Sequence, residues 1–196
     1  MAINYFDYIS SFTGKFKKTR VLHEEVDAAT YEYLAAKNKS YADFIKEEGF
    51  CSYENGLFSI VNPLTYSKEL ALPGITGLYS ADVIVKTGFG DFIKSDLQWG
   101  AANVIHHSFY NGEGNIGSEV GYLLTFNLPD ASFHKNFFKK KLFKQALEKF
   151  GPLKPDENFG FPMDFPWSKE KDLEKIENVS VYKTKEYLEL LSKKYA

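Results

Sequence analysis

The segment ENGLFSIVNP, residues 54–63, stands out in the sequence as a turn followed by a short strand. Asn55 and Gly56 are a turn dipeptide, and a run of mostly apolar residues follows them. A proline ends the run, because it lacks a donor N–H and also restricts the residue before it. The segment therefore predicts a strand over Leu57–Val61 that starts at a tight turn.

Three more strands are expected after this one, over Asp82–Thr87, Asp91–Ser95 and Asn103–Tyr110. The first two are separated only by Gly88-Phe89-Gly90, which is typical of a tight turn between antiparallel neighbours. The middle third of the chain thus predicts a small antiparallel sheet.

Helices are expected on both sides of this sheet. Before it, apolar spacing predicts helices over Glu24–Lys37 and Tyr41–Glu48, the second with Ser40 as N-cap. After it, the clearest helical periodicity covers Phe133–Phe150, and a last helix is expected over Lys183–Tyr195. The predicted fold class is α+β: a small, mainly antiparallel sheet with flanking helices, followed by a helical C-terminal part.

The polar, glycine-rich stretch Asn111–Ser118 is the best candidate for a boundary inside the chain. It divides the sequence into a helix–sheet part over residues 1–112 and a helical part over residues 118–196. We expect the two parts to pack as one compact unit.

The charge and the cysteine content narrow the classes of function. The formal net charge is −2, from 24 basic and 26 acidic residues, whereas a nucleic-acid-binding protein needs a basic surface. A single cysteine cannot form an internal disulfide, which suits a reducing cytoplasm. The sequence shows no signal-peptide pattern and no membrane-spanning run. A cytoplasmic protein without direct nucleic-acid or membrane binding is expected.

The loop Gly112–Gly117 matches the three-glycine pattern of dinucleotide-binding proteins. That pattern requires a parallel βαβ unit and a helix whose N-terminus holds the phosphates. No rhythm of parallel strands surrounds the loop, and Glu113 would place a negative charge beside the pyrophosphate. A flexible loop is the favoured interpretation.

No other residue pattern points to catalysis, a metal or a cofactor. The adjacent His106 and His107 would point to opposite faces of a strand, so they cannot easily share one ion. Cys51 has no CxxC partner, and a half-buried inert thiol is the common case. The carboxylate pairs, such as Glu47 and Glu48, lack the apolar surroundings that raise a pKa. The sequence predicts a protein that is not an enzyme.

Two sets of linked motifs resemble known families. The segment of residues 54–63 and the later TGFGDFI, residues 87–93, resemble the GAD-like domain, in which a GLF-strand-NP segment leads to such a turn. The stretch ALEKFGPLKPDENFGF, residues 146–161, looks like the domain that usually follows it, where a helix leads into a GPL–DE–GF pattern. The two resemblances occur in the expected order and cover nearly the whole chain.

Proteins with this pairing include the immunity partners of type VI secretion DNase effectors, which bind the toxin in the producing cell. The resemblance thus implies a bacterial immunity protein, or antitoxin, whose partner is a cognate nuclease toxin. After Phe161 the chain departs from the family pattern and reads PMDFPWS, residues 162–168. This departure is expected to alter the contact surface for a different toxin.

An immunity protein for a nuclease would use acidic residues to steer association with a basic cleft, and aromatic residues as anchors. The loops predicted around the sheet supply such partner-binding candidates: Glu47, Glu48, Tyr53, Asp91, Asp96, Tyr110, Glu113 and Glu119. The alternative is a small-ligand-binding regulatory protein or enzyme that uses the Gly112–Gly117 loop.

Overall fold

In the computed structural model, the described residues are 9–66, 68–75, 82–98, 102–106, 112–116, 119–162 and 175–196. Within them, seven strands form one sheet in chain order, each antiparallel to its neighbours. The strands are β1 (Val21–Glu24), β2 (Phe50–Tyr53), β3 (Phe58–Ile60), β4 (Asp82–Thr87), β5 (Phe92–Ser95), β6 (Ala102–His106) and β7 (Gly112–Asn115). A second antiparallel pair consists of β8 (Glu157–Gly160) and β9 (Ser180–Lys183).

Helices precede, interrupt and follow the large sheet. They are α3 (Ala28–Lys37), α4 (Lys39–Glu48), α6 (Ala131–Asn136), α7 (Lys140–Phe150) and α9 (Thr184–Tyr195). Shorter helical turns are η1 (Ile9–Thr13), α2 (Gly14–Phe16), η2 (Glu54–Gly56), η3 (Glu69–Ala71), α5 (Val120–Tyr122), η4 (Leu123–Asn127) and η5 (Ile176–Asn178). The large sheet is antiparallel throughout, and the helices do not alternate regularly with its strands, which confirms the predicted α+β class.

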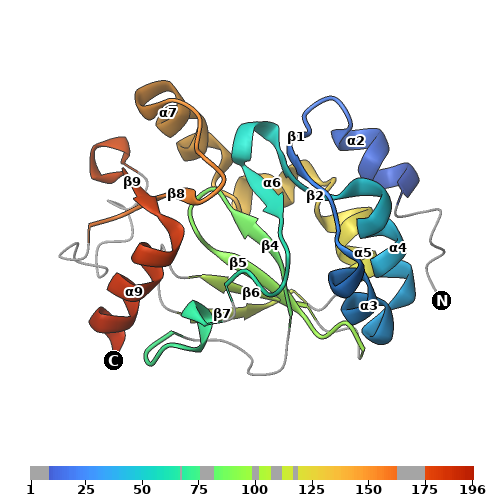
Figure 1. The fold of residues 1–196 in the computed structure, drawn as a ribbon. Coiled ribbons are helices and arrows are strands. Elements are labelled where there is room, and N and C mark those ends of the chain that lie inside the picture. Colours follow the sequence, from blue (N-terminus) through green and yellow to red (C-terminus); the bar gives the residue numbers. More distant parts are fainter. Residues whose placement is uncertain are drawn as a thin grey trace.

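The sheet lies between two unequal layers (Figure 1). On one side α3 and α4 cover it, and on the other side lie α9 and the β8–β9 hairpin. The larger apolar cluster includes Leu34 and Phe44 from the helices together with Phe58 from β3. The smaller cluster joins Phe92 of β5 to Leu188 of α9. Both faces of the sheet are therefore packed, and Phe159 of β8 also belongs to the larger cluster.

A bulge in β4 sends side chains to both of these layers. Val83 pairs with Lys94 and Val85 with Ile93, so Ile84 is an extra residue in the strand. As a result Ile84 and Val85 both belong to the larger cluster, while Val83 belongs to the smaller one.

Most predicted strands are confirmed. The expected bounds of β4 match those observed, and the strands expected over 57–61 and 91–95 contain β3 and β5. The expected strand over 103–110 is observed as β6, and its last four residues lie outside the described part of the chain. Strands β1 and β2 were not predicted, because each has only four residues and β2 is buried throughout without an alternating pattern.

The predicted helix starts need correction. The first helix begins at Ala28 rather than at Glu24, because the Asp27 side chain caps it by accepting from the Thr30 N–H at 2.8 Å. The second helix is capped by Asn38 and not by Ser40, since the Asn38 side chain accepts from the Tyr41 N–H at 3.0 Å.

The expected single helix over 133–150 is wrong. Lys139 adopts a left-handed conformation with φ = 49°, which separates α6 from α7. The break changes the chain direction, and Phe138 before it and Phe143 after it are both buried. Burial of two phenylalanine rings at this bend outweighs the local helical propensity.

The glycine-rich loop chosen as a boundary contains a strand. β7 pairs with β6 and so extends the sheet of the first part. The larger apolar cluster also joins the two proposed parts, since Phe12 and Phe58 share it with Phe143 and Phe159. The division into two domains stays a prediction. Across the described residues, no helix is both long and apolar enough to cross a membrane.

Candidate functional site

The structure places three of the predicted partner-binding residues in the interior. Glu48, Tyr53 and Asp91 are 3%, 0% and 1% exposed. The Glu48 carboxylate accepts from the Tyr53 hydroxyl at 2.9 Å and from Thr13 Oγ1 at 3.2 Å. Arg20 forms an ion pair with the same carboxylate at 3.6 Å. Burial raises the pKa of Tyr53, and the charge of Glu48 raises it further, so Tyr53 remains a proton donor.

This network corrects the expectation that Glu48 and Tyr53 face a partner from a surface loop. Residue Asp91 sits in the turn after β4, where its N–H donates to Thr87 Oγ1 at 3.1 Å. Glu48 and Tyr53 thus hold α4 and β2 together, because a buried carboxylate needs donors that replace its lost hydration.

The other candidates lie on separate elements. Glu47 is exposed near the end of α4, Asp96 is half-buried after β5, and Glu119 is exposed at the start of α5. Glu113 is in β7 opposite Ile105, and Tyr110 lies outside the described residues. Contact of these residues with a partner stays a prediction.

A row of side chains crosses the first four strands on the face that carries α9. Val21 pairs with Ser52, Ser52 with Ser59, and Ser59 with Lys86. Directly paired residues in a sheet point to the same face. The Ser52 and Ser59 hydroxyl oxygens lie 2.7 Å apart and share a hydrogen bond.

Lys86 joins this row to the C-terminal layer. Its ammonium donates to the carbonyl oxygens of Pro155 and Glu157, at 3.1 and 2.8 Å, and to Thr184 Oγ1 at 3.2 Å. Only 4% of the residue is exposed, and burial lowers the pKa of Lys86 to about 8. All three protons of the ammonium are engaged, so its charge serves to fix the segment 155–157 on the sheet.

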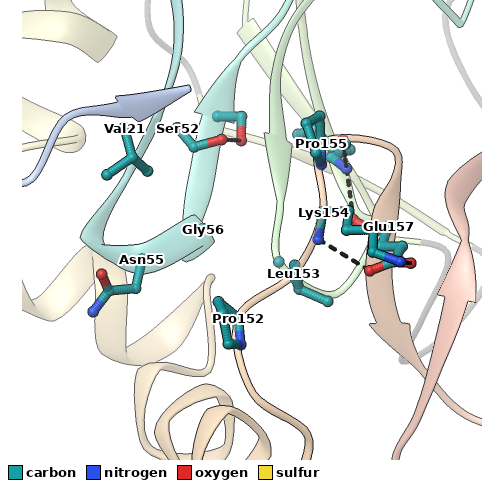
Figure 2. Close-up of a pocket in the computed structure, with 12 residues that line it drawn as sticks. Val21, Ser52, Asn55, Gly56, Pro152, Leu153, Lys154, Pro155 and Glu157 are labelled. Atoms are coloured by element: carbon teal, nitrogen blue, oxygen red, sulfur yellow. Dashed lines mark hydrogen bonds and ion pairs between the residues drawn. The ribbon is translucent and has the colours of Figure 1, made fainter. Parts of the chain in front are cut away.

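Between the serine pair and that segment the surface is hollowed by a pocket of about 530 Å³. Figure 2 shows Val21, Ser52 and Asn55 on one side of it and Pro152 to Pro155 on the other. The wall opposite the sheet is fixed by Glu157, which accepts from the Lys154 N–H at 3.0 Å. A pocket with mixed polar and apolar walls and a size in the range of ligand sites is thus held open by hydrogen bonds.

Two smaller pockets adjoin the first. One of about 190 Å³ shares Ser52, Ser59 and Pro155 with it, and continues toward Glu24 and Asn62. Another of about 230 Å³ shares Val21 and Asn55 with it, and continues past Lys18 to Lys140, Lys144 and Phe143 of α7. We call the three together the β1 groove, because it runs alongside the first strand of the sheet.

The sequence motifs meet beside this groove. The Gly88 N–H donates to the Leu57 carbonyl at 2.8 Å, and the Gly88 carbonyl accepts from the Phe159 N–H at 2.8 Å. A Cβ atom at Gly88 would contact the Phe143 ring and lie 2.8 Å from the Gly56 carbonyl oxygen. The GLF segment, the TGFGD turn and the ENFGF segment therefore support one another through main-chain contacts that only glycine permits.

The groove offers surfaces for binding and few reactive groups. Neither histidine nor cysteine is found among the described residues that line the main pocket, and its two serines bond to each other. In the adjoining pocket, Cys51 donates to the Glu48 carbonyl at 3.2 Å, and burial raises the pKa of its thiol. Within the described residues, no three histidine, cysteine or carboxylate groups are close enough to hold a metal ion.

The structure also does not show the geometry that a dinucleotide-binding loop over residues 112–117 would require. Gly112 to Asn115 are extended and paired with β6, so this part of the motif does not form a turn that leads from a strand into a helix.

Sequence reasoning did not single out Ser52, Ser59 or Lys86. Their juxtaposition depends on the register of four strands, two of which the sequence did not reveal. The only available signal was the family resemblance, since Ser59 and Gly88 lie within its first pair of motifs, and Pro152 and Leu153 within its second.

The protein is of the α+β class, with helices on one face of an antiparallel sheet and a strand–helix layer on the other. The groove is open between the sheet and the segment 152–157. The family model of the GAD-like domain matches residues 7–104, which is half of the chain. The chain belongs to the GAD-like domain family.

Over most of its length the fold is also similar to a solved structure, that of Atu4351 from Agrobacterium tumefaciens. The TM-score is 0.72 with 16% sequence identity, and the match covers 94% of this chain and 88% of the other. The likeness thus extends beyond the matched family domain to the C-terminal layer. A search of curated proteins finds no match.

Proposed function

We propose that this protein is an immunity protein that binds and neutralises a cognate secreted toxin, a nuclease effector of a type VI secretion system. The linked motifs support the proposal, because they resemble a GAD-like domain followed by the C-terminal domain of such immunity proteins. The fold supports it as well, since the motif segments of both halves pack together around Gly88.

The single observation that carries the proposal is the β1 groove. It combines a preformed concave surface with walls fixed by the contacts of Lys86 and Glu157. A preformed surface loses little conformational entropy on binding, which favours tight association with a folded partner. Because its two serines bond to each other and Lys86 is engaged with the segment 155–157, the main pocket is better suited to binding than to catalysis.

In this proposal the protein is not an enzyme and needs no cofactor. It acts in the cytoplasm of the producing cell, where it occludes or distorts the toxin's active site. The surface acids Glu47, Asp96, Glu113 and Glu119 and the ring of Tyr110 remain candidates for contacts outside the groove. Nucleic acid and membranes are not proposed as direct partners.

Co-expression with the product of the adjacent reading frame tests the proposal. We expect that product alone to stop growth and degrade DNA in a heterologous host, and this chain to restore growth and co-purify with it. If the adjacent product is harmless, or is toxic but neither bound nor neutralised, the immunity role is wrong.

A second candidate function is the binding of a small regulatory ligand. The volume of the main pocket, about 530 Å³, favours it, since this lies within the range of about 300–1,000 Å³ for small-molecule sites. A thermal-shift screen with nucleotides and metabolites tests it, because a bound ligand raises the melting temperature. Absence of any shift across the panel would count against this alternative.

A further inference from the structure

Lysines gather at one end of the β1 groove, whereas the pocket at the other end is lined by Glu24 and Asp156. At one end lie Lys18, Lys140 and Lys144, and among the described residues that line this pocket the only carboxylate is that of Glu54, which Lys140 neutralises at 2.9 Å. Lys18 and Lys144 are exposed and form no ion pair with any described residue. This end of the groove therefore carries an excess of positive charge, although the whole chain is slightly acidic.

The middle of the groove adds one more exposed cation. The Lys154 side chain is 73% exposed, and its closest carboxylate, that of Glu157, is 3.7 Å away. Glu157 is already engaged by the Lys154 N–H and by Lys183. An exposed pair at this distance is weak, so Lys154 remains available to a partner's carboxylate.

The shape of the groove favours an extended occupant. β1 is the terminal strand of the sheet in the described residues, so a further strand can pair with its outer edge. Val21 is 43% exposed and lines both the main pocket and the one that contains Lys18, and Leu153 lines the main one, so both present apolar surface. The pairing register of β1 shifts between Val21 and Glu24, so only a short part of its edge is regular enough to pair with a further strand. The pocket and the lysines must then supply most of the binding.

We propose that the β1 groove binds an extended, acidic segment of the toxin, with an apolar side chain of that segment in the pocket between Ser59 and Leu153. This inference rests on the proposed immunity function and names the part of the toxin that is recognised. A nuclease active-site cleft is basic because it binds phosphates, so an acidic segment lies outside it. The toxin is then inhibited by distortion or steric cover, and not by mimicry of DNA.

Charge reversal tests the role of the lysines. The Kd of wild type and of Lys18→Glu/Lys144→Glu for the adjacent toxin is measured at low and high salt. We expect the double variant to bind at least about tenfold more weakly at low salt and to lose most of the salt dependence. The matched control is Lys135→Glu/Lys193→Glu, which makes the same charge change at exposed positions outside the groove and should bind like wild type.

Filling the pocket tests the apolar contact. Ser59→Leu should weaken binding by about tenfold while the melting temperature shows that the protein is folded. If Ser59→Leu does not fold, Val21→Glu at the exposed strand edge serves instead, because it places a negative charge opposite the acidic segment. An array of overlapping toxin peptides should then show binding to acidic segments with apolar residues.

The outcomes separate the two proposals. A toxin that wild type neither binds nor neutralises contradicts the immunity role itself. If wild type binds the toxin and the lysine and pocket variants bind it with the same affinity, the β1 groove is not the binding site. Binding of basic peptides on the array would likewise contradict the proposal that the recognised segment is acidic.

Discussion

Gly88 illustrates how much a single residue determines in this protein. Its N–H and carbonyl bond to Leu57 in the first motif and to Phe159 in the last one, and Phe143 packs where a side chain would begin. At the same scale, Lys86 and Glu48 are charged groups that the fold has buried with a full set of partners. The role of such a residue depends on its neighbours in the structure, and the residue type alone does not predict it.

Gly88→Ala should lower the free energy of unfolding by about 1–3 kcal/mol, because a Cβ there overlaps the Phe143 ring and the Gly56 carbonyl. The measurement is urea denaturation followed by circular dichroism. Gly14→Ala is the control, since nothing lies within 4 Å of a Cβ at Gly14, and it should be neutral or slightly stabilising. Equal effects at the two positions would contradict the close approach at Gly88.

Lys86 should make stability depend on pH in the alkaline range. Its pKa is about 8 in the folded protein and 10.5 for the free side chain, so above pH 8 the folded state loses the proton first. The unfolded state then binds more protons, and the free energy of unfolding rises between about pH 8 and 10.5, by up to about 3 kcal/mol from this group.

Lys86→Met isolates this contribution, because the difference in unfolding free energy between wild type and variant should grow across that pH range. The exposed Lys193→Met should show no such trend. A pH-independent difference for Lys86→Met would show that the ammonium is not perturbed by burial.

At the scale of elements, short caps and bends override the local pattern of the sequence. α3, α4 and α6 each begin at an Asp or Asn side chain that accepts from the third N–H after it. Helical periodicity by itself extended α3 too far toward the N-terminus and joined α6 to α7. Periodicity reports which face is apolar, whereas a cap or a left-handed residue decides where a helix begins or ends.

Asn38→Ala should lower the unfolding free energy by about 1 kcal/mol, because it removes the N-cap of α4. The Asn38 side chain also donates to the Leu97 carbonyl at 3.2 Å, which adds to the loss. Ser40→Ala, at the position that the sequence suggested as the cap, should change stability little. Denaturation curves of the two variants compare them directly, and a larger effect at Ser40 would contradict the observed cap.

At the scale of the whole molecule, the two halves share one interior. Phe89, Phe143, Phe159 and Phe161 form a chain of ring contacts with centroid distances of 5.5–6.5 Å, from the sheet turn to the C-terminal layer. Removing either half would expose these rings to water. We therefore expect the sheet and the C-terminal layer to fold as one cooperative unit.

Residues 1–112 expressed alone should not fold cooperatively, because the phenylalanines contributed by the second half are missing from the core. The full chain should unfold in one transition. Amide NMR dispersion and a urea titration of the fragment measure this. A well-dispersed spectrum with a cooperative transition would show that the first half is an independent domain.

The sequence by itself determined the α+β class, the bounds of β4 and the family, because turn dipeptides, short apolar runs and linked motifs are local signals. Only the tertiary structure decided the groove. Ser52, Ser59 and Lys86 become neighbours through strand register, and Lys18 and Lys144 through the approach of α7 to the edge of the sheet. Contacts between residues far apart in the chain depend on packing of the whole core, and no local pattern encodes them.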